Sequence, residues 1–342
     1  MSRKGSVWLI EGAQATPTQN MKEKNWLDLR KQGIGGSDIA AIMGRSPWST
    51  PLGIYCQKVG LAPDREATEA MEFGSRMEST LRKWAEDDIN EDGSLAGVSS
   101  GGLIGGFKVL SSPYLYRDLL LPFIANVDGV VLKMGDHIAE EEWAGLELKT
   151  VDRFYAKEWD DGKIPDYYRD QVQWYMGVTG LPRWVIGALI GKRFEIRVVW
   201  SDQKVIEELR TAATDFWERY VLRRIMPFAR AEDGNLLITL YPEASEQIIV
   251  DDNFVATIQT YLDAASAEKD SKEQKDAAKV AIEQRIGDAK GLKAGACTAT
   301  WSRYDVNRVD SKKLKDEYPE VFTAVQKASR EGRLTVKKEK KE

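Results

Sequence analysis

Three charged residues offer the clearest chemistry in this sequence of 342 residues: Asp128, Glu147 and Lys149. They lie in the apolar segments NVDGVV and LELKT, where an isolated charge is costly unless it is paired or binds a metal. Alternate side chains of a strand share a face, so Glu147 and Lys149 point to the same side. If Asp128 comes from the neighbouring strand, two carboxylates meet at one cation beside a lysine. That arrangement suits phosphodiester hydrolysis, in which a divalent metal neutralises phosphate charge and activates water.

The spacing of these three residues is by itself a weak signal, because such triplets arise by chance in any charged protein. A plainer interpretation is that Asp128 opens an Asp-Gly turn while Glu147 and Lys149 form a solvated strand face. The apolar surroundings favour the metal site over this alternative.

The composition excludes several other chemistries. The chain has one histidine, His137, and two cysteines, Cys56 and Cys297, so zinc fingers, iron–sulfur clusters and His-rich metal sites lack ligands. His137 lies in the acidic stretch GDHIAEEE, where an exposed turn is expected. Any metal must be held mainly by carboxylates, which favours Mg²⁺ or Mn²⁺.

Charge and hydropathy restrict the cellular setting. The formal charge of −5 gives no global basic field, although a local basic groove for nucleic acid is compatible with it. No apolar run approaches the ~20 residues that span a bilayer. The run VWLI near the N-terminus is shorter than the ~7 residues of a minimal signal-peptide core. A cytoplasmic protein is therefore expected, with no membrane partner.

The first part of the chain predicts helices. Residues 25–45 suggest a short helix, a glycine-rich turn and a second helix that begins near Ser37, which is a good N-cap. A third helix is predicted from Pro51 to Gly60. Residues 67–89 carry apolar side chains at helical spacing and predict one long amphipathic helix.

The segment 107–200 changes to strands. FKVLSSPYLY, FIANVDGVVLK, WAGLELKTV, RWVIGALI and RFEIRVVW are rich in β-branched or aromatic residues. PDYYRDQVQWYMGVTG, between the third and fourth of these, predicts a helix, and residues 202–225 predict another. The expected fold class is therefore α/β, a mixed sheet with helices packed on it.

A second domain, residues 231–342, is expected to follow a first domain of residues 1–230, because the composition becomes polar and Ala-rich. LLITLYP is strand-like. Residues 254–291 are helical by propensity, and a helical hairpin is favoured over a projecting coiled coil because no a/d repeat is sustained. Residues 296–310 suggest a strand or hairpin, and residues 310–329 a closing helix.

Five segments in order resemble a known family: GIGGSDIAAIMGRSPWSTPLGIYCQKVG, FGSRMEST, NVDGVV, GLELKTV and PDYYRDQVQWYMGVTG. Together they look like the YqaJ-type viral recombinase nucleases, relatives of phage lambda exonuclease in the PD-(D/E)xK superfamily. The resemblance covers roughly residues 25–225. It implies a restriction-endonuclease-like core flanked by helices, with a helical C-terminal extension. It also implies a metal-dependent 5′→3′ exonuclease that degrades linear double-stranded DNA and leaves 3′ single strands for annealing.

The resemblance also implies roles for individual residues. Gln171 matches the first glutamine of a QxQ helix motif, and Gln173 faces about 160° away from it around a helix, so Gln173 takes second place. In the same resemblance, Lys149 contacts the nucleophilic water, and Gln171 reaches the site with its amide. The implied metal ligands are Asp128, Glu147 and the backbone carbonyl of Leu148, with Glu78 near the metal.

A terminal 5′-phosphate is received, by the same resemblance, at Ser37 and a nearby arginine. Arg30 matches best and Arg45 is the other candidate. A helix start also offers free N–H groups to an anion. The aromatic residues Tyr168 and Trp174, with Tyr175, could stack on bases, but core positions are favoured for them.

The implied cofactor is Mg²⁺, with Mn²⁺ able to substitute. The implied partners are double-stranded DNA ends, a single-strand annealing protein and further copies of the chain, in a homo-oligomer such as a trimeric ring. The setting is the cytoplasm of a bacterial host, with a phage or prophage gene. Two rival functions remain open: a DNA endonuclease on the same core, and a non-catalytic DNA-binding or assembly protein.

Overall fold

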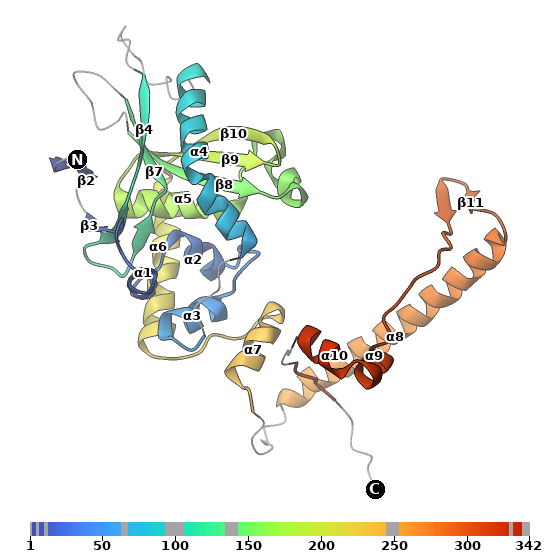
Figure 1. The fold of residues 1–342 in the computed structure, drawn as a ribbon. Helices are drawn as coiled ribbons and strands as arrows, with labels where there is room; N and C mark the ends of the chain where they lie inside the picture. The colour runs from blue at the N-terminus through green and yellow to red at the C-terminus, as the bar shows by residue number, and fades with distance from the viewer. Residues whose placement is uncertain are drawn as a thin grey trace. The chain divides into compact units, whose positions relative to one another are not determined.

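The computed structural model describes residues 2–4, 7–9, 13–62, 68–92, 106–133, 143–243, 253–327 and 331–336 (Figure 1). His137 lies outside these residues, as does the expected turn around it. None of the helices within the described ranges has the length and apolar composition that crossing a bilayer requires. The chain divides into two compact units, Met1–Leu240 and Tyr241–Glu342.

The first unit extends past the boundary expected at residue 230. Asp233 accepts hydrogen bonds from the Thr50 hydroxyl and from the backbone N–H of Arg230. Residues 234–240 form helix α7 (Gly234–Leu240), not the strand expected there. Leu236 and Leu240, four residues apart, pack against the core of this unit, and that spacing is satisfied by a helix.

A five-stranded mixed sheet forms the centre of the first unit. Its β8 and β9 are parallel, and every other neighbouring pair is antiparallel. All of β9 is buried, which explains its continuous apolar sequence. In spatial order the strands are β10 (Arg193–Trp200), β9 (Arg183–Ile190), β8 (Ala144–Val151), β7 (Gly129–Lys133) and β4 (Phe107–Ser111).

Two of the predicted strand segments are each divided between two sheets. FKVLSSPYLY forms β4 and then β5 (Tyr114–Asp118), and FIANVDGVVLK forms β6 (Ile124–Asn126) and then β7. The strand β5 pairs with β3 (Ala13–Pro17) on one side and with β6 on the other, in a small antiparallel sheet. A separate pair, β1 (Ser2–Lys4) and β2 (Val7–Leu9), lies near the N-terminus.

Helices cover both faces of the central sheet (Figure 1). On one face, Leu81 and Ala85 of α4 (Glu69–Asp92) pack with Leu146 and Leu148 of β8. On the other face lies α5 (Asp166–Thr179), with Val172 and its neighbours packed on β9. A mixed sheet between helices confirms the expected α/β fold class. The long helix expected over 67–89 is also confirmed.

Of the remaining helices of this unit, α2 and α6 pack against α5, and α3 packs against α2. The expected helix–turn–helix and third helix are present, with Thr50 as the N-cap of α3 and Gly60 in the left-handed region at its end. Gly35, and not Ser37, is the N-cap of α2, because the Asp38 carboxylate accepts the Gly35 N–H at 2.8 Å. The elements are α1 (Glu23–Lys31), α2 (Gly36–Ile42), α3 (Pro51–Val59), η2 (Arg153–Gly162), α6 (Gln203–Phe216), η3 (Trp217–Leu222) and η4 (Ala231–Asp233).

In the second unit, helix α8 (Asn253–Ile286) runs without interruption, so the favoured helical hairpin is wrong. The polar segment EKDSKEQKD has no glycine or proline to turn the chain, and its Lys, Glu and Gln residues favour helix. The pairs Lys269–Glu273 and Lys279–Glu283, each 3.8 Å apart, add i,i+4 support.

The rest of the second unit is a hairpin and two short helices. The strands β11 (Gly291–Ala294) and β12 (Cys297–Thr300) form a hairpin around Gly295, whose φ is +59°. Only β12 lies within residues 296–310, where a strand or hairpin is expected, so the hairpin begins earlier than predicted. The expected closing helix is broken into α9 (Ser311–Glu317) and α10 (Pro319–Val325). Pro319 causes the break, because a proline disfavours helical geometry at the residue before it.

Candidate active site

Strand β8 sorts its side chains between the two faces of the sheet. Leu146 and Leu148 face α4, whereas Glu147 and Lys149 point toward α5. Asp128 directly precedes β7, and Gly129 is paired with Leu146 in the antiparallel register. The structure therefore brings together the two carboxylates and the lysine that the sequence predicts.

A backbone hydrogen bond holds the Asp128 side chain beside β8. The N–H of Leu148 donates to Asp128 Oδ2 at 2.8 Å, and Arg82 donates to the Asp128 carbonyl at 3.3 Å. Burial raises the pKa of the Asp128 carboxyl, although Lys149, the Leu148 N–H and Arg82 all act to lower it. The carboxyl thus lies in a poorly hydrated place where a cation would stabilise its charge.

Glu147 is the most strongly perturbed acid of this group. Burial raises the pKa of Glu147 to about 8, and the nearby Asp128 charge adds to the rise. Gln171 Nε2 donates to Glu147 Oε1 at 2.6 Å, and the Lys149 ammonium donates to the same oxygen. The other oxygen, Oε2, is buried without a hydrogen-bond partner in the described part of the chain.

Lys149 remains a cation in this setting. Burial alone would lower its pKa, but Glu147, Tyr168 and Asp128 together outweigh burial, so the pKa of the Lys149 ammonium lies above its ordinary value. Its Nζ lies 4.9 Å from the centre of the Tyr168 ring, a cation–π distance. A general base needs a pKa near the working pH, so Lys149 is suited to donate hydrogen bonds and not to accept a proton.

Glu78, on α4, approaches the cluster formed by Asp128, Glu147, Lys149 and Gln171. Burial raises the pKa of the Glu78 carboxyl, and the Asp128 charge raises it further. Arg82, one helical turn later, pairs with Glu78 and also reaches the Asp128 carbonyl. Sequence reasoning missed Arg82, although its i,i+4 spacing from Glu78 is a signal that could have found it.

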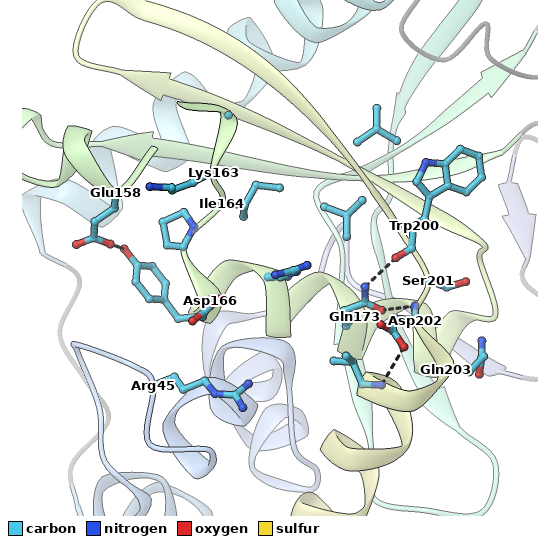
Figure 2. Close-up of a pocket in the computed structure, with 17 residues that line it drawn as sticks. Arg45, Glu158, Lys163, Ile164, Asp166, Gln173, Trp200, Ser201, Asp202 and Gln203 are labelled. Atoms are coloured by element: carbon cyan, nitrogen blue, oxygen red, sulfur yellow. Dashed lines mark hydrogen bonds between the residues drawn. The ribbon is translucent and has the colours of Figure 1, made fainter. Parts of the chain in front are cut away.

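The two glutamines of α5 have different surroundings. Gln171 lies in the cluster, where its Nε2 also donates to the Tyr175 hydroxyl at 2.8 Å. Gln173 instead donates to the Trp200 carbonyl at 2.8 Å and accepts from the Asp202 N–H at 3.0 Å (Figure 2). Gln173 therefore ties the end of β10 to the start of α6, and it lines a different cavity from Gln171.

Tyr175 is a second residue whose position sequence reasoning did not foresee. Tyr175 and Trp174 are both buried, as favoured, but the Tyr175 hydroxyl also accepts a hydrogen bond from Gln171. Its ring leaves no room beside Gly36, where an added Cβ would lie 2.5 Å from Tyr175 Cε1 and 2.9 Å from Gln171 Cγ. The glycine-rich turn thus permits α2 to approach the site closely.

Arg30 and Ser37 lie beside the carboxylates. Arg30 Nη2 donates to Ser37 Oγ at 3.1 Å, and its guanidinium lies 4.9 Å from the ring centre of Trp26. These residues share a cavity of about 160 Å³ with Asp128 and Glu147. Because Ser37 is not the N-cap, its hydroxyl is available to this cavity.

Arg45 lies elsewhere. Its Nη1 donates to both carboxylate oxygens of Asp170, at 2.8 and 2.9 Å, and its Nη2 lies 3.7 Å from Glu208 Oε1. It lines a larger cavity of about 1190 Å³ on the side of α5 that carries Gln173, together with residues that end β10 and begin α6 (Figure 2). The structure therefore places Arg30, and not Arg45, in the cavity lined by Asp128 and Glu147.

The residues of the cluster fit a divalent cation. The unpartnered Glu147 Oε2 and the raised pKa values of Asp128 and Glu147 describe acids whose burial the neighbouring cations Lys149 and Arg82 do not fully offset. Oxygen ligands of this kind suit Mg²⁺. Within the described ranges no three Asp, Glu, His or Cys side chains converge into a complete metal-binding group, so Asp128 and Glu147 form the pair to which other ligands would be added.

Comparisons with known proteins support a family assignment. Residues 25–182 match the family model described as a YqaJ-like viral recombinase domain. An uncharacterized YqaJ protein from Bacillus subtilis is 31% identical over 329 residues, covering 93% of this chain and 95% of that protein. Among solved structures, an alkaline exonuclease from Laribacter hongkongensis is 19% identical with a TM-score of 0.43, covering 59% of this chain and 97% of its own. The same exonuclease in complex with dAMP gives a TM-score of 0.44 at the same identity and coverage.

Proposed function

Because the chain belongs to the family of YqaJ-like viral recombinase domains, we propose that it is a metal-dependent deoxyribonuclease. Its substrate is linear double-stranded DNA, which it degrades from 5′ ends to leave 3′ single strands. The observation that carries this proposal is the group of Asp128, Glu147 and Lys149, whose two acids line the cavity that holds Arg30 and Ser37. Two adjacent acids, one of them buried, beside a permanent cation suit the hydrolysis of an anionic diester.

Mg²⁺ is the proposed cofactor, and Mn²⁺ is a substitute. The proposed ligands are the carboxylates of Asp128 and Glu147 and the backbone carbonyl of Leu148, with Glu78 nearby. When bound, the metal would neutralise charge on the scissile phosphate and lower the pKa of water. Arg82 would hold Glu78 at the cluster through their ion pair.

The protein's own groups supply orientation and charge. Gln171 fixes the Glu147 carboxylate through one oxygen and leaves the other free for a ligand. The Lys149 ammonium would donate a hydrogen bond to the attacking water or to a phosphate oxygen, where negative charge develops. Tyr175 would keep the Gln171 amide from rotating.

The Arg30–Ser37 pair supplies the proposed preference for a 5′ end. A guanidinium that already donates to a hydroxyl presents further N–H groups to phosphate oxygens. The pair shares its cavity with Asp128 and Glu147, so a bound terminal phosphate would place the strand beside the acids. The separate position of Arg45 favours Arg30 for this role.

The test is digestion of linear duplexes with 5′-phosphate or 5′-hydroxyl ends and of closed circular DNA, in Mg²⁺ and in EDTA. We expect the 5′-phosphorylated linear DNA to be degraded in Mg²⁺ and not in EDTA. The closed circle should be left intact, because it offers no terminal phosphate. Arg30→Ala is expected to reduce the advantage of a 5′-phosphate, since charge-assisted hydrogen bonds to it are worth roughly 1.5–3 kcal/mol. Lys31→Ala is the matched control.

Each remaining result would favour a rival function. Cutting of the circle, together with indifference to the terminal phosphate, would indicate an endonuclease on the same core. Failure of the wild-type protein to cut any of these substrates in Mg²⁺ or Mn²⁺ would indicate a non-catalytic DNA-binding or assembly protein.

The proposed partners are a single-strand annealing protein and further copies of the chain, in a ring such as a trimer, in the bacterial cytoplasm. The second unit is the proposed contact site, because α8 exposes the apolar side chains of Phe254, Ile258 and Tyr261 along one stretch. Deletion of residues 241–342 is expected to weaken assembly or partner binding, measured by sedimentation and pull-down. A deletion that changed neither would remove this role.

A further inference from the structure

An exposed tryptophan is held beside the cluster by the loop between α2 and α3. Trp48 is 47% exposed, although indole is a large apolar group that is usually well covered. Its ring lies 4.9 Å from that of Tyr167, edge to face, and 5.8 Å from that of Tyr168, measured between ring centres. Both tyrosines belong to α5, the helix that carries Gln171.

The tyrosines that support this indole are themselves fixed. The Tyr167 hydroxyl donates to Glu158 Oε2 at 2.6 Å, and the Tyr168 ring lies 5.7 Å from the ring of the buried Trp159. On the loop side, the backbone N–H of Trp48 donates to Ser46 Oγ at 3.2 Å. The indole is therefore presented to solvent in a defined position, which lowers the entropy lost when a ligand binds.

The same row of rings reaches the active site. The Tyr168 ring that contacts Trp48 also lies 4.9 Å from Lys149 Nζ. The row thus runs from the half-buried Lys149 ammonium, through Tyr168, to an exposed indole. A strand whose phosphate lies at Lys149 would pass its neighbouring bases near Trp48.

We infer that Trp48 is a stacking site for a nucleobase of the bound strand, a few nucleotides from the bond that is cut. The inference rests on the proposed nuclease function and adds a DNA-positioning residue to it. A planar base would cover the exposed indole face, and aromatic stacking of this kind tolerates every base. Trp48 would act by binding the strand and keeping it in register, without contact to the reacting atoms.

The test is equilibrium binding, measured by fluorescence anisotropy of a labelled duplex with a short 5′-phosphorylated single-stranded end, in Ca²⁺ and in EDTA. Trp48→Ala is expected to raise Kd about 5- to 140-fold, the range that corresponds to loss of one stacked base. Trp48→Phe is expected to retain most of the affinity. Trp84→Ala is the matched control, because Trp84 is 40% exposed but packs on Phe194 of β10.

Removing the base provides an independent arm that needs no variant. Duplexes that carry one abasic nucleotide at successive positions from the 5′ end are expected to lose affinity for the wild-type protein at one position. At that position Trp48→Ala should cause no further loss. Equal losses on intact and abasic DNA at every position, or no loss from either change, would overturn the inference.

Because binding is measured without cleavage, the two proposals can fail separately. Base-dependent binding by a protein that cuts no DNA would contradict the proposed nuclease function and support the stacking site. Cleavage of linear DNA, with binding that responds neither to Trp48→Ala nor to an abasic nucleotide, would support the nuclease function and contradict the stacking site.

Discussion

Replacing Lys149 by methionine is expected to lower kcat for DNA cleavage about 10²- to 10⁴-fold, the usual effect of removing a group that stabilises transition-state charge or positions the nucleophile. Methionine keeps most of the volume of the lysine and removes the cation. The Lys149 ammonium is held by Glu147 and Tyr168, and its pKa lies above the ordinary value, so it carries a full charge at neutral pH. No other cation is hydrogen-bonded to Glu147 among the described residues.

The measurement is the single-turnover cleavage rate of a 5′-phosphorylated duplex, with the Kd for the same DNA measured in EDTA. Lys192→Met, in the exposed turn between β9 and β10, is the matched control and should keep the wild-type rate. Since the lost interaction acts on the transition state, Kd is expected to change little. A Lys149→Met variant that cleaves within a factor of about three of the wild type would exclude a catalytic role for this lysine.

Replacing Lys58 by methionine is expected to lower the free energy of unfolding by about 3 kcal/mol, at the lower end of the usual range for breaking a buried ion pair. Lys58 Nζ lies 2.6 Å from Asp38 Oδ2, and both side chains are 4% exposed. The same ammonium donates to the Arg30 carbonyl at 3.0 Å. Arg30 Nη2, 4.0 Å from Asp38 Oδ1, would compensate part of the lost positive charge. The expected loss of unfolding free energy therefore lies at the lower end of that range.

The pH dependence of that effect follows from Asp38. Burial would raise the pKa of the Asp38 carboxyl, but Lys58 and Arg30 outweigh burial, so the pKa lies below its ordinary value. In the wild type the carboxylate therefore contributes stability that is present above about pH 4 and is lost as pH falls further. Without Lys58, burial raises the pKa of Asp38, and the variant regains stability as the carboxyl is protonated. The difference between the two proteins should shrink toward acid pH.

The measurement is urea unfolding of both proteins at neutral pH and at about pH 4. The double variant Asp38→Asn/Lys58→Met is the control, because asparagine can still accept the Gly35 N–H while no buried charge remains. It is expected to recover most of the lost stability. A double variant as unstable as Lys58→Met would show that lost packing, and not an unpaired carboxylate, causes the effect.

The local patterns of the sequence predicted the central elements well where periodicity and turn chemistry agree. The strand LELKT and the helix from Asp166 are present, because a buried strand and a helix that ends at Gly180 each have strong local signals. The patterns misassigned LLITLYP and the middle of α8. Short apolar runs fit either a strand or a helix, and packing of Leu236 and Leu240 on the core decided for the helix.

The sequence by itself determined which chemistry is available: one histidine and two cysteines leave carboxylates to hold a metal, and strand alternation places Glu147 and Lys149 on one face. Only the tertiary structure decided which distant groups join them. It brought Gln171 and Arg30 to the acids and directed Gln173 and Arg45 to the other side of α5. The physical reason is that a local pattern fixes the face on which a side chain lies, whereas the packing of helices on the sheet determines what that face meets.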